Sequence, residues 1–184
     1  SAASDVYKRQ YLKNMRQISD TVNYNIIQAH DVSSPEFNQQ LSLLYDLNKD
    51  KIQSIALYDM DGELLGAEPV TLQKEGVEVS RQSWFENAKA KIENMHFSTP
   101  HMQDLFQDDA KRFHWVISLS RAVDVIDGDS PENGILLVDM KYSFIEEMMD
   151  RINDRTRGRY YYLCDREGKL IYHPYANEIS NGLF

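Results

Sequence analysis

The sequence predicts an α+β fold in which helices precede an antiparallel sheet, and three patterns support this prediction. Apolar residues in 11–29 recur at steps of three and four, as they do on one face of a helix. Residues 52–66 and 160–172 each contain two β-rich runs around a turn, which is the pattern of a β-hairpin. Residues 113–123 alternate large apolar and smaller side chains, as a strand with two different faces does.

These patterns divide the chain into four parts. We expect residues 1–10 to be non-native, because they do not fit the regular pattern that begins at Tyr11. Residues 11–50 are expected to form N-terminal helices, and 51–157 a first sheet module. Residues 158–184 repeat the order strand, Asp-x-x-Gly turn, strand, so we expect them to begin a second, truncated module.

Composition excludes several classes of function. The 184 residues carry a formal net charge of -9, which argues against a nucleic-acid partner because nucleic-acid-binding proteins display basic surfaces. No apolar run approaches the roughly 20 residues of a membrane-spanning helix, so membrane attachment is expected only through flanking segments absent from this sequence. Cys164 is the only cysteine and is expected to serve packing, since it allows neither an intramolecular disulfide nor a thiolate zinc site. No cofactor or metal is expected.

The first helix carries a single apolar stripe, made of Tyr11, Met15, Ile18, Val22, Ile26 and Ala29. The stripe either packs on its own domain or forms the seam of a homodimer, and a seam needs roughly three to four heptads. Both hold if the helix is longer than the core that it covers.

A second helix follows a break at residues 31–34. Ser34 is placed to cap it, and Pro35 occupies the first turn, where its missing N–H costs no hydrogen bond. The helix is expected to end near Asn48, with a buried face made of Phe37, Leu41, Leu44 and Leu47.

The turn of the first hairpin is Asp59-Met60-Asp61-Gly62. A calcium-binding EF-hand loop would need further oxygen ligands and a late Glu, which do not follow. We therefore interpret these residues as a plain turn between a strand at 52–58 and its partner at 63–66.

Residues 81–88 are expected to form a lid over a ligand. The long polar connection 68–79 leads into them, and such connections in compact domains are often functional. Ser83 is expected to cap a helix that reaches about Asn94, with Glu86 three residues on as in a capping box.

Two aromatic and two polar residues make this lid a candidate binding site. Trp84 and Phe85 point about 100° apart on the helix, so one enters the core while the other faces a cleft. Arg81 contributes a permanent cation, and Gln82 an amide with donors and an acceptor.

The strand at 113–123 is expected to have one apolar face, made of Phe113, Trp115, Ile117 and Leu119. Its other face, with Ser118 and Ser120, is small and partly polar, which suits either a small-molecule pocket or close packing of a helix. Arg121 shares the apolar face near the strand end, where it can reach water or a carboxylate.

Asp139 lies near the end of the apolar run 135–140, which is expected to be a central strand buried on both faces after a turn-rich loop at 127–134. A carboxylate in that position is costly unless it is paired. Three roles are open: binding a ligand amine, capping a helix over 143–153, or an ion pair with Arg121.

This order of elements resembles the double Cache (dCache) extracellular sensor domains of bacterial receptors. The matching stretches are 55–66, 83–88 with the Trp-Phe-x-x-Ala element, 117–123, 134–142, and 161–174 with Asp165, Gly168 and His173-Pro174. The resemblance covers most of the chain from Tyr11. It implies a PAS-like five-stranded antiparallel sheet preceded by a long helix, with a membrane-distal first module and a membrane-proximal second one.

The resemblance also implies a ligand site. In amino-acid-binding members of the family, an Arg two positions before the Trp holds the ligand carboxylate, and an Asp near the end of the last distal strand receives the amine. Gln82 occupies the first position here, while Asp139 fits the second. The ligand-binding residues are therefore expected to be Trp84, Phe85, Asp139, Arg81, Gln82, Arg121 and Ser118.

Two classes of function remain. The first is the extracytoplasmic sensing domain of a membrane receptor, most like a sensor histidine kinase and alternatively a chemoreceptor or diguanylate cyclase, in which an amino acid, amine or carboxylate shifts the helix arrangement. The second is a ligand-free structural or homodimerisation module. Catalysis is not expected, because no zinc-type histidine pairing, nucleophile elbow or phosphate loop occurs and the histidines are scattered: His30, His96, His101, His114 and His173.

Overall fold

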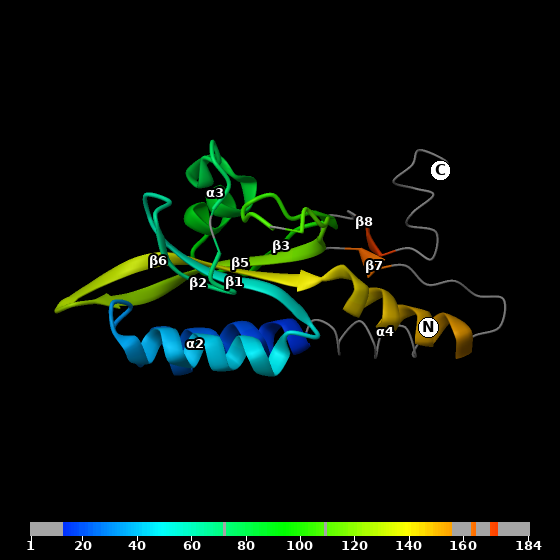
Figure 1. Ribbon diagram of the computed structural model, residues 1–184, viewed down its shortest axis with the longest axis horizontal. Helices are drawn as coiled ribbons and strands as arrows, with labels where there is room; N and C mark the ends of the chain where they lie inside the picture. The colour runs from blue at the N-terminus through cyan, green and yellow to red at the C-terminus, as the bar shows by residue number, and fades with distance from the viewer. Residues whose placement is uncertain (1–12, 72, 109, 156–162, 165–169, 173–184) are drawn as a thin grey trace.

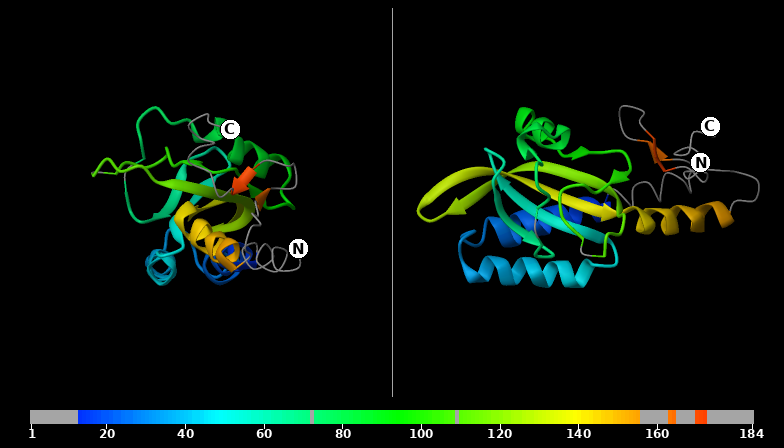
Figure 2. Two further views of the ribbon diagram at one scale, coloured as in Figure 1. Left: turned by 90° about the vertical axis from the view of Figure 1, so that its right-hand side faces the viewer. Right: turned by 45° about the horizontal axis from the view of Figure 1, so that its top comes forward.

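The computed structural model describes residues 13–71, 73–108, 110–155, 163–164 and 170–172. A twisted antiparallel sheet forms the middle layer of the molecule (Figure 1). The N-terminal helix and α2 (Pro35–Asn48) cover one face, and α3 (Ser83–Ala90) covers the other, as the two rotated views also show (Figure 2). The predicted α+β architecture is confirmed.

The sheet is five positions wide. Its strands run in the order β2-β1-β6-β5-β3, and β4 pairs with the same strand, β5, as β3 does. All pairings are antiparallel. The strands are β1 (Ile52–Asp59), β2 (Leu64–Glu68), β3 (His96–Phe97), β4 (His101–Met102), β5 (Trp115–Asp127) and β6 (Ser130–Lys141). The strand β6 lies at the centre and is buried from residue 134 to 140, as predicted for 135–140.

The N-terminal helix runs from residue 13 and ends in a π-helical segment, η1 (Val22–Ile27). Within the described residues its apolar stripe packs on the sheet of its own domain, in one core with Ile117 and Leu119. The stripe residues that this core buries are Met15, Ile18, Val22 and Ile26. Ala29 is exposed, and Tyr11 lies outside the described residues.

The second helix, α2, begins as predicted. The side chain of Ser34 accepts a hydrogen bond from the Phe37 amide at 3.3 Å, and the helix ends at Asn48. Phe37 and Leu41 are buried, but Leu47 is 71% exposed, so the predicted four-residue buried face is too long. Six residues at 100° each place Leu47 about 120° away from Leu41 around the helix axis, which turns it to solvent.

The first hairpin is confirmed as a hairpin. The Asp59 carboxylate accepts hydrogen bonds from the backbone amides of Asp61 and Glu63, both at 2.9 Å, so it closes the turn on itself. Gly62 adopts φ +90°, a conformation that favours glycine. The two strands of the second predicted hairpin, β7 (Leu163–Cys164) and β8 (Leu170–Tyr172), also pair antiparallel, and the residues between them lie outside the described part.

The connection between β5 and β6 is shorter than the predicted loop at 127–134. The strands pair out to Asp127 opposite Ser130, which leaves a turn of only Gly128 and Asp129, with φ +63° at Gly128. This long hairpin projects beyond the other strands (Figure 1). Its residues are polar because they face solvent, and a polar strand outside the core has the same sequence pattern as an irregular loop.

Beneath α3 lies a second core. Residues 103–108 cross this face of the sheet: the Gln103 amide donates to the His114 carbonyl before β5, and the Leu105 carbonyl accepts from Lys74 beyond β2. Leu105 and Phe106 are buried against the sheet together with Ala56, Tyr58, Ile135 and Leu137. This face therefore carries α3 towards one end and the crossing segment towards the other.

α4 (Tyr142–Arg155) follows β6 directly and continues beyond the end of the sheet (Figure 1). It begins one residue before and ends two residues after the range 143–153 that the sequence predicts. A short 3₁₀ turn, η2 (Val79–Arg81), precedes α3.

Candidate functional site

The aromatic pair of the predicted lid lies in the first turn of α3. Phe85 enters the core with 1% of its surface exposed, while Trp84 remains half-buried at the border of that core. The Trp84 ring lies 5.5 Å from the ring of Tyr58 on β1, measured between centroids. Ser120 on β5 holds the same turn by donating to the Trp84 carbonyl at 3.0 Å. The small face of β5 is therefore covered by a closely packed helix.

The ends of α3 differ from the prediction. Ser83 is the first helical residue, the preceding Gln82 occupies the cap position, and no side chain makes a cap hydrogen bond there. The helix stops at Ala90 rather than near Asn94, because Lys91 leaves the helical conformation with φ -129° and ψ 77°. Ile92, predicted on the helix, is consequently 63% exposed.

Asp139 is the most unusual polar residue on this face. It is 1% exposed, and it lies directly opposite Ser118 in the register of β6 with β5. The Ser118 hydroxyl donates to the Asp139 carboxylate at 2.5 Å. Ser118 Oγ is also 3.3 Å from Nε2 of His101 on β4.

The surroundings of Asp139 favour its neutral form. Burial raises its pKa to about 6, against the smaller lowering effects of the Ser118 hydrogen bond and the nearby His101. Among the described residues, no Arg or Lys forms an ion pair with this carboxylate. An ionised carboxylate at this depth therefore gains from the arrival of a cation.

Tyr58 adds an unpartnered donor to the same face. Its hydroxyl is buried and has no hydrogen-bond partner in the described part of the chain. Burial, and then the charge of Asp139, raise the pKa of this hydroxyl, so it stays protonated. Buried hydroxyls nearly always have partners, so this hydroxyl is free to donate to a polar group that reaches it.

The structure does not bring all seven expected ligand-binding residues together. Trp84, Phe85, Ser118 and Asp139 all lie on the α3 face. Arg81 points away from this group: its side chain is 80% exposed and pairs with Glu78 at 2.8 Å. Gln82 is half-buried at the start of α3.

Arg121 lies on the opposite face of the sheet. It donates to Asp20 of the N-terminal helix at 2.8 Å and to Ser19 at 3.3 Å. The suggested ion pair between Arg121 and Asp139 is therefore wrong, because an odd-numbered separation from Ser118 turns Arg121 towards the other layer. The suggestion that Asp139 caps the following helix is also replaced, since its partner is Ser118 of the neighbouring strand.

Sequence reasoning missed Tyr58, His101 and Ser54, which is a further hydrogen-bond partner of Asp139. Side chains alternate along β1, so the sequence alone predicts that Ser54 and Tyr58 lie on the same face of the sheet. Their position opposite Asp139 depends on the β1–β6 register, which a single sequence does not give. His101 is one of the scattered histidines, and nothing in its sequence context relates it to Asp139.

Other types of site find little support in the described residues. No group of three or more His, Cys, Asp or Glu side chains there is arranged to hold a metal ion. No helix of the described part is long and apolar enough to cross a membrane.

Solved structures with the same fold are bacterial ligand-binding domains. The ligand-binding domain of the Pseudomonas aeruginosa PAO1 amino acid chemoreceptor PctC, in complex with GABA, matches with a TM-score of 0.65 and 16% identity, over 95% of this chain and 71% of that one. The domain of Pseudomonas fluorescens CtaA with L-serine matches with a TM-score of 0.66 and 14% identity, over 96% and 69%. The domain of PctB from Pseudomonas aeruginosa PAO1 with L-Gln matches with a TM-score of 0.65 and 18% identity, over 95% and 66%.

These likenesses show the fold, and the chain spans between 66% and 71% of the three neighbours' lengths. No curated protein sequence matches the chain significantly. A family model does: dCache_1, described as the Cache domain, matches residues 3–183. Cache domains are sensory ligand-binding domains of receptors rather than enzymes. The chain belongs to the Cache domain family.

Proposed function

We propose that this chain is the extracytoplasmic small-molecule-sensing domain of a membrane-bound bacterial signalling receptor, with its ligand bound on the sheet face beneath α3. The observation that carries the proposal is the buried Asp139 carboxylate, which has hydroxyl and imidazole neighbours but no Arg or Lys ion-pair partner among the described residues. Trp84 and the orphan hydroxyl of Tyr58 lie on the same face.

The ligand class follows from this charge. A primary amine is a compact cation with three donors, so it suits a carboxylate whose described partners are neutral hydroxyls. Amino acids and amines are therefore favoured over simple carboxylates. The neighbours support this choice, since their structures hold GABA, L-serine and L-Gln. Trp84, Phe85, Ser118 and Asp139 remain the proposed ligand-binding residues. Gln82, at the start of α3, is the remaining candidate for contact with a ligand carboxylate group, because Arg81 and Arg121 are engaged elsewhere.

The domain boundaries are part of the proposal. Residues 11–50 supply the helices that cover one face, and 51–157 form the membrane-distal module with its helical exit, α4. Residues 158–184 begin the membrane-proximal module. A ligand on the α3 face would act on the receptor through β6, since this strand carries Asp139 and leads straight into α4.

The receptor class is a further proposal. The solved neighbours are chemoreceptor domains, which favour a chemoreceptor at least as strongly as the sensor histidine kinase suggested by sequence, and a diguanylate cyclase is a third option. A homodimer through the N-terminal helix would need a surface other than most of its apolar stripe, because the core of the same domain buries Met15, Ile18, Val22 and Ile26. Light scattering with and without ligand measures this assembly directly.

A second function has one observation in its favour. Leu105 and Phe106 are buried against the same sheet face that would receive the ligand. If these side chains fill the available space permanently, the module is a ligand-free structural or interaction domain. Binding measurements separate the two functions.

The test is a thermal-shift screen of the chain with GABA, L-serine, L-glutamine, ethylamine and succinate. We expect an amine-bearing compound to raise the melting temperature, because a ligand that binds only the folded state stabilises it. The shift should disappear in Trp84→Ala and Asp139→Asn and persist in Arg121→Gln, the matched control on the opposite face. Stabilisation by none of these compounds, or equal stabilisation of every variant, would contradict the proposal.

A further inference from the structure

A cavity of about 440 Å³ opens at the edge of the sheet, separate from the residues assigned to the amine site. Its volume falls within the usual range of small-molecule pockets. Phe106 forms part of its wall and also belongs to the core under α3, so the crossing segment 103–108 separates the two regions.

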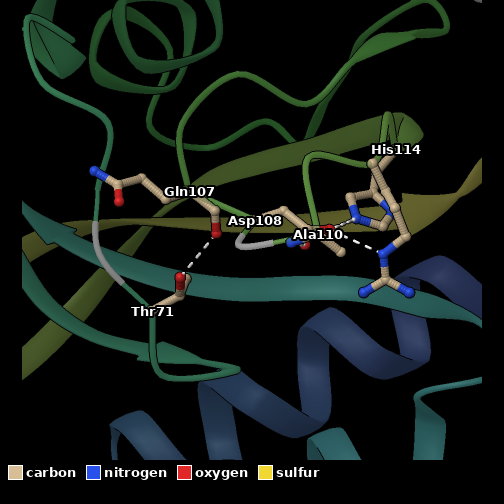
Figure 3. A network of polar contacts seen from close by, with 6 residues as sticks. Thr71, Gln107, Asp108, Ala110 and His114 are labelled. Atoms are coloured by element: carbon tan, nitrogen blue, oxygen red, sulfur yellow. Dashed lines mark hydrogen bonds and ion pairs between the residues drawn. The ribbon is translucent and has the colours of Figure 1, made fainter.

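The cavity exists because β2 is shorter than β1. The pairing of these strands ends at Ile55 opposite Glu68, so the first residues of β1 have neighbours in β6 but none in β2. Two loops close the gap instead of a strand. They meet where the Thr71 hydroxyl donates to the Gln107 carbonyl at 3.0 Å (Figure 3).

The charged groups in the cavity wall neutralise one another. Asp108 accepts hydrogen bonds from the Ala110 amide at 2.9 Å, from His114 Nε2 at 2.6 Å and from Arg112 Nε at 3.3 Å (Figure 3). Together these hydrogen bonds hold the pKa of Asp108 below its usual value, and the bond from His114 has the largest effect. A carboxylate matched by a guanidinium leaves no excess of either sign, so the wall favours a ligand without net charge.

The rest of the lining is of two kinds. Neutral donors and acceptors come from amide and hydroxyl side chains, namely Gln53, Ser54, Thr71, Gln103 and Gln107. Apolar surface comes from Tyr45, Pro69 and Phe106. A sugar or cyclic polyol presents the matching chemistry, because its rim carries hydroxyls that both donate and accept while its ring faces carry C–H groups. Amide side chains and a hydrogen-bonded Asp–Arg pair can bind the hydroxyls, and aromatic rings can pack on the C–H faces of the ring.

We propose that this cavity is a second binding site, for a neutral polyhydroxylated molecule of monosaccharide size. The amide side chains of Gln103 and Gln107 bind its hydroxyls, and Phe106 and Tyr45 pack on its apolar face. Ser54 lies in the cavity wall and is also a hydrogen-bond partner of Asp139, so an occupant would touch a residue of the amine site.

Saturation-transfer NMR with D-glucose, D-galactose and myo-inositol, each at millimolar concentration, tests the proposal on the unmodified chain. We expect saturation transfer to at least one of the three compounds. The double substitution Gln103→Ala with Gln107→Ala should weaken its binding at least tenfold. Arg112→Gln, at a largely exposed side chain, should weaken it about threefold without disturbing a core. Circular dichroism checks that each variant is folded.

Trp84→Ala is the control, and it should leave sugar binding unchanged because Trp84 does not line this cavity. Transfer to none of the three compounds would overturn the proposal, as would undiminished binding in both cavity variants. Binding that is lost in Trp84→Ala and kept in the cavity variants would place the sugar beneath α3 and overturn it too. Failure of the amine screen would leave this test unaffected, since Trp84, Phe85, Ser118 and Asp139 do not line this cavity.

Discussion

Asp139 and Ser118 face each other across β6 and β5, and the serine hydroxyl donates to a carboxylate that is 1% exposed. Neutral hydroxyl donors do not offset the loss of water around an ionised carboxylate, which costs several kcal/mol for an ion moved to a protein interior. Among the described residues, no Arg or Lys forms an ion pair with Asp139 that would offset this desolvation cost. We propose that a cationic ligand relieves the cost that remains.

The first prediction concerns the pH dependence of stability. The pKa of Asp139 is about 6 in the folded chain, and an unfolded Asp has a pKa of about 3.9. The folded state therefore binds more protons between these values, so the Asp139 contribution favours folding below pH 4 and is lost as the pH rises through 6. The difference corresponds to roughly 3 kcal/mol.

Urea unfolding of the unmodified chain and of Asp139→Asn at pH 4, 5, 6 and 7.5 measures this contribution. The asparagine variant cannot ionise, so its stability relative to the unmodified chain should rise across this range. A constant difference between the two proteins would show that Asp139 is not the titrating group.

Ser118→Ala should destabilise the chain more at pH 7.5 than at pH 4. Removing the donor leaves a buried anion with one partner fewer, and such a loss typically costs about 1–3 kcal/mol, whereas the neutral acid needs the bond less. Ser120→Ala is the matched control, because Ser120 donates to the neutral Trp84 carbonyl. Its cost should not depend on pH. Equal pH dependence of the two variants would contradict this assignment.

Tyr58→Phe should leave the stability of the ligand-free chain unchanged or raise it by about 1 kcal/mol. The hydroxyl is buried without a partner, so deleting it removes a desolvation cost and no hydrogen bond. The same variant should bind an amine-bearing ligand more weakly if the hydroxyl serves the ligand. A large loss of stability in urea unfolding would show that the hydroxyl has a structural partner.

Gly134→Ala should destabilise the chain by about 1–3 kcal/mol or more. A Cβ at this position would lie 2.7 Å from the Tyr58 carbonyl oxygen and 2.8 Å from Val125 Cγ2, and the backbone of a central strand cannot move aside. Gly128→Ala is the comparison: nothing lies within 4 Å of its Cβ, so only the φ of +63° penalises it, by about 1–2 kcal/mol. Urea unfolding should rank Gly134→Ala as the more damaging change.

The layers of the fold were predictable because local chemistry dictates them. Periodicity identified the helical stripe around Val22, the Ser34 cap and the central strand, since each depends on near neighbours in the chain. The predictions that were wrong depend on the geometry at the ends of helices and strands. The helical rotation at Leu47 turns this side chain away from the buried stripe. The strand before the β5–β6 turn continues to Asp127, and the sequence did not predict this because polar strands outside a core resemble loops.

The site was predictable only in part, for a related reason. Trp84 and Asp139 were identified, since an aromatic pair on a short helix and a carboxylate in an apolar strand are unusual in themselves. The neighbours of Asp139 were not, because Ser118, Ser54 and His101 reach it through strand register, which is a long-range property. Alternation placed Arg121 on the correct face of its strand, with Ile117 and Leu119, but its carboxylate partner is Asp20 of the N-terminal helix rather than Asp139.

The most direct test of the proposed function is a calorimetric titration of the chain with the most stabilising amine of the screen and with its N-acetylated form. The account predicts that the amine binds and that acetylation weakens binding at least tenfold, because it removes the cation that pairs with Asp139. In Asp139→Asn the two compounds should differ little. Equal binding of both compounds to the unmodified chain, or an unchanged preference in Asp139→Asn, would contradict the account.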